Sequence, residues 1–107
     1  LAINSIWEVV GYYEVAKTTV DTVHVNIQDI MKCCLLSNAS ILIMAHNHPT
    51  DYEKPSPDDD ALTEQVGKAC DIMGIRFLDH VIIGQRNKSY SYKKNKRLKK
   101  YFYDPKL

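Results

Sequence analysis

The 107-residue sequence contains little cysteine, glycine or proline and no long hydrophobic run. Its three cysteines form neither an even set nor a C-x-x-C pair, which excludes a disulfide-rich secreted scaffold and favours a reducing, cytoplasmic setting. Four glycines and four prolines beside 45% hydrophobic residues exclude a disordered chain. The longest hydrophobic run, residues 41–45, is far shorter than the roughly 20 residues that span a bilayer. We therefore expect one folded domain with no membrane partner.

The formal net charge of +1 hides an uneven distribution along the chain. Residues 1–85 carry five basic and twelve acidic side chains, whereas residues 86–107 carry nine basic and one acidic. Basic side chains interleaved with tyrosine and phenylalanine suit phosphate contact and base stacking. The same composition is also typical of a solvated tail whose charge only aids solubility. The basic segment 93–107 therefore has two interpretations, a DNA-binding extension and a solubilising tail.

The spacing of hydrophobic residues predicts two helices. Asn26 is placed as the N-cap of the first helix, in which apolar residues recur at helical intervals: Ile27, Ile30, Met31, Cys34 and Leu35. Ser56 as N-cap and Pro57 as first residue begin the second helix, and Gly74 ends it. We expect its inner stripe to be Leu62, Val66, Ala69 and Met73. Cys34 and Cys70 lie on apolar helical stripes, which indicates simple core filling.

Strands are predicted between and around these helices. The continuously apolar run 40–45 is typical of a strand covered on both faces in a mostly parallel sheet. Stretches rich in β-branched and aromatic residues predict further strands at residues 6–16, 20–25, 76–83 and 89–92. Strands that alternate with helices indicate a layered α/β domain.

Two histidines follow directly on the apolar strand, in His46-Asn47-His48-Pro49. In an extended chain, residues i and i+2 point to the same side about 6.6 Å apart, so both imidazoles can converge on one metal ion. A catalytic site needs a third protein ligand, and Asp59 follows in the first turn of the second helix. The competing interpretation is structural, because Ser56-x-x-Asp59 at the start of a helix is also a capping box.

The ordered combination of His46-x-His48-Pro49, a loop and Ser56-x-x-Asp59 resembles the JAMM (MPN-plus) metalloenzyme signature. Its surroundings resemble the bacterial RadC-like branch, in the stretches 14–15, 38–39, 41–48, 78–84 and 90–92. The resemblance implies a three-layer α-β-α JAMM/cytidine-deaminase-like domain with a central mixed sheet. This domain is expected over residues 1–92, with the basic extension 93–107 behind it. Because the chain opens without Met, we expect it to have been cut from something longer. The resemblance implies that it is the C-terminal domain of a RadC-like protein.

The resemblance also implies the site. A zinc ion is expected to be held by His46, His48 and Asp59, with a water in the fourth position. Thr50 and Asp51 replace the serine and glycine that commonly follow the His-Pro pair in relatives. This departure removes no ligand, although it changes the loop beside the site.

Two catalytic residues follow from the same resemblance. Glu14 aligns with the upstream catalytic glutamate, and Glu8 is the fallback in a less matching register. Thr18 stands near Glu14 where many relatives have glycine. Ser56 is expected to hydrogen-bond the developing oxyanion or the attacking water. His80 recurs in the family's strand motif, and we expect it to be structural or to support the site.

Two functions remain open. The first is a zinc-dependent hydrolase, a metallopeptidase or isopeptidase that acts on a peptide or protein. The second is a DNA-associated accessory protein of RadC type, in which the zinc fold is a binding module and the basic segment contacts DNA. A nucleobase deaminase is excluded, since its H-x-E and P-C-x-x-C signature is absent.

Overall fold

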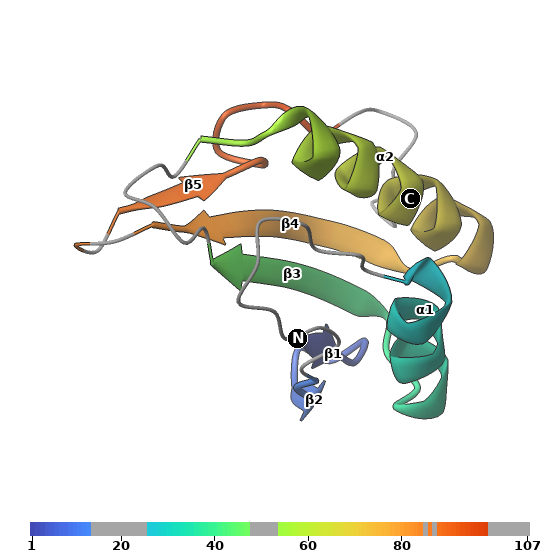
Figure 1. The fold of residues 1–107 in the computed structure, drawn as a ribbon. Coiled ribbons are helices and arrows are strands. Elements are labelled where there is room, and N and C mark those ends of the chain that lie inside the picture. The colour runs from blue at the N-terminus through green and yellow to red at the C-terminus, as the bar shows by residue number, and fades with distance from the viewer. Residues whose placement is uncertain (14–25, 48–53, 85, 87, 99–107) are drawn as a thin grey trace.

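The computed structural model describes residues 1–13, 26–47, 54–84, 86 and 88–98. Within them the chain forms a five-stranded sheet in the order β2-β1-β3-β4-β5, accompanied by two helices (Figure 1). The elements in chain order are β1 Ala2–Ile3, β2 Val9–Gly11, α1 Ile27–Leu36, β3 Ile41–Asn47, α2 Pro57–Met73, β4 Arg76–Ile83 and β5 Ser89–Ser91.

β3 lies at the centre of the described sheet, between β1 and β4. It pairs parallel with β4, which the α2 crossover permits, whereas the pairs β1–β2, β1–β3 and β4–β5 are antiparallel. The α/β class with a central mixed sheet is therefore confirmed, and the expectation of a mostly parallel sheet is wrong. A continuous apolar run indicates that a strand is central in its sheet, but it does not indicate whether the adjacent strands run parallel or antiparallel to it.

α1 begins where the sequence predicts. The side chain of Asn26 caps it by accepting a hydrogen bond of 2.8 Å from the backbone N–H of Gln28. Ile30 and Cys34 are buried along its inner face, whereas Leu35 is exposed. The predicted apolar stripe is thus confirmed at Ile30 and Cys34 and is wrong at Leu35, near the C-terminal end of the helix.

α2 is also bounded by the predicted residues. Ser56 is its N-cap and Pro57 its first residue, and Gly74 ends it in the left-handed conformation, at φ 70°, which glycine adopts at little cost. Val66 and Cys70 are buried as predicted, and Leu62 packs against the core. Met73 is exposed, however, and the buried face also includes Thr63 and Gly67. The buried face of α2 thus includes the polar Thr63, which a pattern of apolar side chains does not predict.

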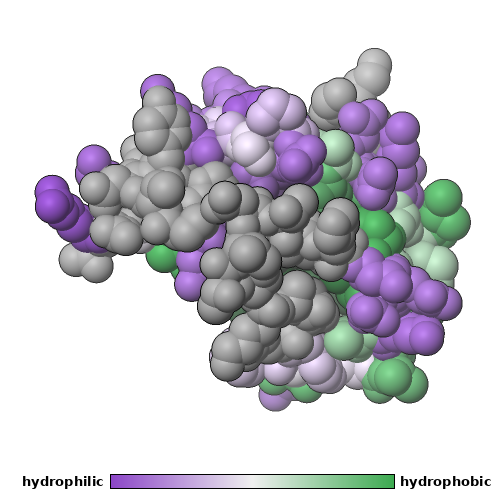
Figure 2. Space-filling model, viewed as in Figure 1, coloured by the Kyte–Doolittle hydropathy of each residue, from purple (hydrophilic) through white to green (hydrophobic). Residues whose placement is uncertain are grey.

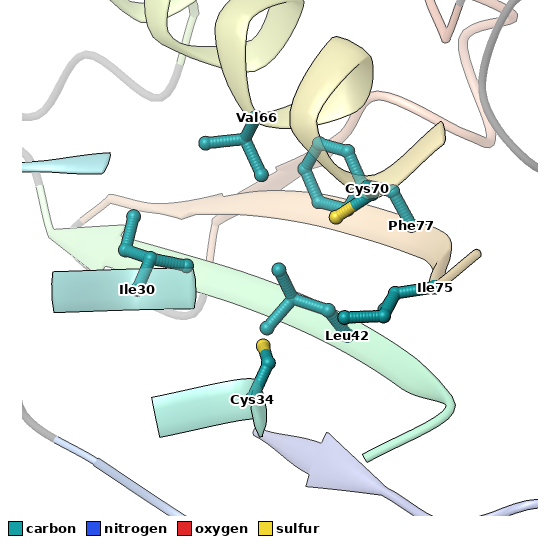
Figure 3. Close-up of a cluster of buried hydrophobic side chains, with 7 residues drawn as sticks. All are labelled: Ile30, Cys34, Leu42, Val66, Cys70, Ile75 and Phe77. Atoms are coloured by element: carbon teal, nitrogen blue, oxygen red, sulfur yellow. The ribbon is translucent and has the colours of Figure 1, made fainter. Parts of the chain in front are cut away.

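Both helices contribute to one hydrophobic core against β3 and β4 (Figure 3). Its members are Ile30, Cys34, Leu42, Val66, Cys70, Ile75 and Phe77. Burial raises the pKa of the Cys70 thiol to about 12, and it also raises the pKa of Cys34. Core filling by these two cysteines is therefore confirmed. Because the described helices share this core, the third layer of the expected α-β-α arrangement stays a prediction.

The other predicted strands fare differently. β4 matches its predicted range, and β5 ends one residue earlier than expected. β2 lies within the predicted range 6–16, but β1 was missed because it is only two residues long. The prediction for residues 20–25 lies outside the described residues.

Residues 93–98 lie against the domain rather than away from it. The backbone N–H of Lys93 donates to Asp79, and Arg97 forms an ion pair of 2.7 Å with Asp60 in the first turn of α2. Leu98 packs against the hydrophobic core. The predicted domain boundary after Tyr92 stays a prediction, and residues 99–107 lie outside the described part of the chain.

The described surface is mostly polar in the view of Figure 2, with hydrophobic residues toward the right-hand edge, where the two helices end. The exposed hydrophobic residues of those helix ends are Leu35, Leu36, Ile72 and Met73. Among the described residues, no helix is long and apolar enough to cross a membrane.

Candidate metal centre

The candidate site lies where the central parallel strands end and α2 begins. β3 runs two residues further than predicted, so His46 is still part of the strand. Alternation along a strand puts His46 on the same face as Leu42, whose side chain contacts the core beneath α2. The carboxyl ends of parallel strands are common ligand sites in α/β domains, and the first turn of α2 borders this one.

His46, at the end of β3, contacts Asp59, in the first turn of α2. Nε2 of His46 lies 3.0 Å from Oδ1 of Asp59, and the two side chains retain 25% and 12% of their exposure. The other carboxylate oxygen of Asp59, Oδ2, accepts a hydrogen bond of 2.8 Å from the backbone N–H of Ser56. The hydroxyl of Ser56 accepts one of 3.2 Å from the backbone N–H of Asp59. The two residues thus form a complete capping box, which fixes Asp59 with one oxygen turned toward His46.

The surroundings of Asp59 favour its charged form. Burial alone would raise the pKa of the carboxyl, but hydrogen bonds from His46 and from the backbone of Ser56 outweigh it and hold the pKa well below its usual value. Asp59 is therefore a carboxylate at neutral pH, the form in which it can bind a cation.

A second histidine, His80, contacts the His46 ring on the side away from Asp59. Nε2 of His80, on β4, lies 2.9 Å from Nδ1 of His46, and Nδ1 of His80 lies 2.6 Å from the hydroxyl of Thr63 on α2. The ring of Tyr92 stacks on that of His80, with centroids 4.9 Å apart and planes inclined by 7°. His80 was expected to support the site, but Thr63 and Tyr92 were missed. Thr63 was detectable in principle, because it follows Asp59 by four residues and so shares its helix face.

Tyr92 is linked in turn to the start of α2. Its hydroxyl donates to Oδ1 of Asp60 at 2.7 Å, and Oδ2 of Asp60 accepts from Arg97. The Arg97 guanidinium lies over the Tyr90 and Tyr92 rings, at 5.9 and 5.4 Å from their centroids. Asp60 thus attaches Tyr92, directly after β5, and the start of the basic segment to the helix that carries Asp59.

Two of the predicted site residues, Glu14 and His48, lie outside the described residues. Among the described residues, the structure brings together His46, Asp59 and Ser56. Glu8, the fallback for Glu14, lies before β2 and accepts a hydrogen bond of 3.0 Å from the side chain of Asn4. In the described part of the chain, no group of three His, Cys, Asp or Glu side chains is arranged to hold a metal ion.

Comparison with known proteins gives this geometry a family. Residues 1–98 match the family described as "RadC-like JAB domain". The chain belongs to the RadC-like JAB domain family. A UPF0758 protein of Photorhabdus laumondii is 36% identical over 86 residues, which cover 80% of this chain and 37% of the relative. UPF0758 proteins from serotypes 5b and 7 of Actinobacillus pleuropneumoniae are 43% identical over 67 residues, or 63% of this chain and 30% of each relative.

Membership confirms the RadC-like, JAB/MPN-type resemblance inferred from the sequence. This RadC-like domain spans about a third of the length of the curated relatives it matches, 30% to 37% of each. The match ends at residue 98 and so includes the residues that lie against Asp60 and Asp79.

The donor atoms present suit a zinc ion. An imidazole nitrogen and an ionised carboxylate oxygen are ligands that zinc takes in catalytic sites, and Nε2 of His46 and Oδ1 of Asp59 already face each other. Both side chains are partly accessible, so an ion can reach them from solvent. The donor atoms at this end of the sheet therefore fit a zinc ion.

Proposed function

We propose that this RadC-like domain is a zinc-dependent hydrolase that cleaves a peptide or isopeptide bond. The observation that supports the proposal most is the approach of Nε2 of His46 to Oδ1 of Asp59, 3.0 Å apart at the carboxyl end of β3. The capping box supports it further, because it holds Asp59 by the oxygen that does not face His46.

His46, His48 and Asp59 are the residues proposed to hold the ion, two neutral imidazoles and one carboxylate. When bound, zinc acts as a Lewis acid and lowers the pKa of a water to about 7. Glu14 is proposed to take a proton from the attacking water and to deliver it to the leaving amine. The hydroxyl of Ser56, which accepts from the backbone N–H of Asp59, is proposed to donate to the developing oxyanion.

Turnover of defined substrates tests this proposal. Zinc-loaded protein is incubated with an internally quenched peptide library and with a peptide joined to a lysine side chain by an isopeptide bond. Glu14→Gln is expected to retain zinc and to lose turnover, because the carboxylate acts on protons rather than on the metal. Asp59→Asn is expected to lose both zinc and turnover.

Glu8→Gln is the matched control, since the same atoms change on a nearby acid that hydrogen-bonds Asn4. It is expected to keep both zinc and turnover. Turnover that survives Glu14→Gln removes Glu14 from the mechanism, and turnover that survives loss of zinc contradicts the hydrolase proposal.

A second candidate function, a DNA-associated accessory role, is favoured by one feature of the basic segment. Lys93, Lys94 and Lys96 are exposed, and the backbone that carries them is anchored to the domain through Asp79 and Ser91. Cations on an anchored surface bind phosphate with less loss of entropy than cations on a loose tail.

Binding of a duplex oligonucleotide at several salt concentrations tests this second role. Changing Lys93, Lys94 and Lys96 together to glutamine is expected to weaken binding and to flatten its dependence on salt, by up to about three units of the logarithmic slope. Lys32 and Lys68 changed to glutamine on the helices provide the control. An unchanged slope in the triple variant excludes these lysines as a DNA contact.

A further inference from the structure

A series of four short contacts runs from the backbone of α2 through the candidate metal ligand His46 to the side chain of Asp59. Oγ1 of Thr63 lies 2.8 Å from the carbonyl oxygen of Asp59 and 2.6 Å from Nδ1 of His80. Nε2 of His80 lies 2.9 Å from Nδ1 of His46, whose Nε2 lies 3.0 Å from Oδ1 of Asp59. The chain of contacts therefore begins at the backbone of Asp59 and returns to its side chain.

The carbonyl group at the start of this chain sets the direction of every hydrogen bond. A carbonyl oxygen only accepts, so the single hydroxyl proton of Thr63 points at Asp59. The hydroxyl oxygen of Thr63 then accepts from His80, which places the proton of a neutral His80 on Nδ1. Nε2 of His80 is left as an acceptor, and Nδ1 of His46 donates to it.

This direction has a consequence for the far side of the His46 ring. A neutral His46 with its proton on Nδ1 presents a lone pair at Nε2, and that lone pair faces a carboxylate oxygen at 3.0 Å. Two acceptors at this distance repel each other unless a positive charge lies between them. A divalent cation beside Asp59 supplies this charge in the zinc-loaded protein.

The opposite direction leaves a different contact unsatisfied. If Thr63 donates to His80, the hydroxyl and carbonyl oxygens at 2.8 Å have no proton between them. Water cannot easily relieve that contact, because Thr63 is 3% exposed and His80 is 1% exposed. The stacked ring of Tyr92 also restrains the plane of His80, so neither of its nitrogens turns away readily. All four contacts are therefore satisfied when Thr63 donates to the Asp59 carbonyl, His80 donates to Thr63 and His46 donates to His80. In this arrangement a cation lies between Nε2 of His46 and the Asp59 carboxylate.

We propose that Thr63 and His80 are positioning residues that hold His46 with its proton on Nδ1 and so present Nε2 to a metal ion beside Asp59. The proposal rests on the metal site of the proposed hydrolase and goes beyond it, because both residues act through His46. A ligand histidine fixed in this way needs no change of tautomer or ring orientation when the metal binds, and its donated hydrogen bond makes Nε2 more basic.

Zinc affinity, measured by competition with a chromophoric chelator, tests the proposal with three variants. Thr63→Val keeps the shape of the side chain and removes the hydroxyl, and we expect zinc to bind about 10- to 100-fold more weakly. Thr63→Ser restores the hydroxyl and is expected to restore the affinity. Ser37→Ala removes a matching hydroxyl, which donates to the carbonyl of Cys33 four residues earlier on α1 at 2.7 Å, and is expected to leave zinc affinity unchanged.

The protonation of the histidine rings gives a second readout that needs no variant. In ¹⁵N NMR spectra of the zinc-loaded wild-type protein, we expect His80 to carry its proton on Nδ1 and His46 to be bound through Nε2. A proton on Nε2 of His80, or a wild-type zinc affinity in Thr63→Val, overturns the proposal. Loss of zinc affinity in Ser37→Ala also overturns it, because the effect is then a general loss of stability.

Failure of the two proposals can be told apart. Protein that binds zinc with the expected tautomers and affinities, yet cleaves no substrate, overturns the hydrolase and supports the positioning role. Protein that cleaves substrate while Thr63→Val retains full affinity overturns the positioning role alone. Wild-type protein that binds no zinc overturns both.

Discussion

Replacing Asp59 with asparagine distinguishes its proposed role as a metal ligand from its role in the capping box of α2. Asparagine keeps an oxygen that can accept from the backbone N–H of Ser56, so most of the capping box survives. The charge that faces Nε2 of His46 is lost. We therefore expect the metal-free variant to lose only about 1 kcal/mol of unfolding free energy.

The effect of zinc on stability should differ far more. A ligand that binds only the folded state at 100 times its Kd adds about 2.7 kcal/mol to the unfolding free energy. With an unfolding entropy of about 0.22 kcal/mol/K for a chain of 107 residues, the wild-type Tm should rise by about 12 °C. The Asp59→Asn variant should show almost none of this rise, because the ion loses its anionic ligand.

Differential scanning calorimetry with and without zinc measures both quantities. Asp58→Asn is the matched control, since it removes the same charge from the preceding residue of α2, where the side chain is exposed. It is expected to keep the full zinc-induced rise in Tm. An equal rise in the Asp59→Asn variant would refute Asp59 as a metal ligand and leave it only as a cap.

Three further predictions concern the residues around the site and in the core. Ser56→Ala should cost about 1 kcal/mol of stability through the lost cap and should retain the zinc-induced rise in Tm, which loss of that rise in calorimetry would contradict. Tyr92→Phe should cost about 1.5–3 kcal/mol in urea unfolding because the hydroxyl donates to the Asp60 carboxylate. Burial, and after it the hydrogen bond to Asp60, raises the pKa of Tyr92. The neutral Tyr92 hydroxyl therefore stabilises the fold fully below about pH 10, the pKa of tyrosine in the unfolded chain, and this stabilisation is lost as the pH rises further. The difference in unfolding free energy between wild type and Tyr92→Phe should accordingly shrink at alkaline pH. In thiol labelling of the native protein, the partly exposed Cys33 should react first and the buried Cys70, whose pKa is raised to about 12, only on unfolding, and equal rates would contradict the core assignment.

Local rules in the sequence predicted the helix boundaries well. Asn26 and Ser56 cap the two helices through side-chain oxygens, and Gly74 ends α2 in a conformation that other residues adopt at a cost. These signals depend only on neighbouring residues, so they can be recognised without knowledge of the fold. The β4 strand was predicted for the same reason, from a run of strand-forming residues that ends before Gly84.

Contacts between distant residues were harder to predict. The histidine and carboxylate of the site were named from their order in the chain, but the approach of His46 to Asp59 depends on where α2 crosses the end of β3. Thr63 escaped notice because a threonine in a helix has many ordinary roles, and only its contact with His80 distinguishes it. The parallel pairing of β3 with β4 beside antiparallel neighbours likewise depends on tertiary contacts that a single strand does not encode.

We propose that a metal ion occupies the position between Nε2 of His46 and Oδ1 of Asp59. Anomalous diffraction at the zinc edge, from crystals of the zinc-saturated protein, tests it most directly. We predict a single strong peak about 2.0–2.2 Å from both Nε2 of His46 and Oδ1 of Asp59, with His48 as the third ligand. Zinc-saturated crystals in which the two atoms remain in direct contact, and the anomalous peak lies elsewhere, would contradict the claim.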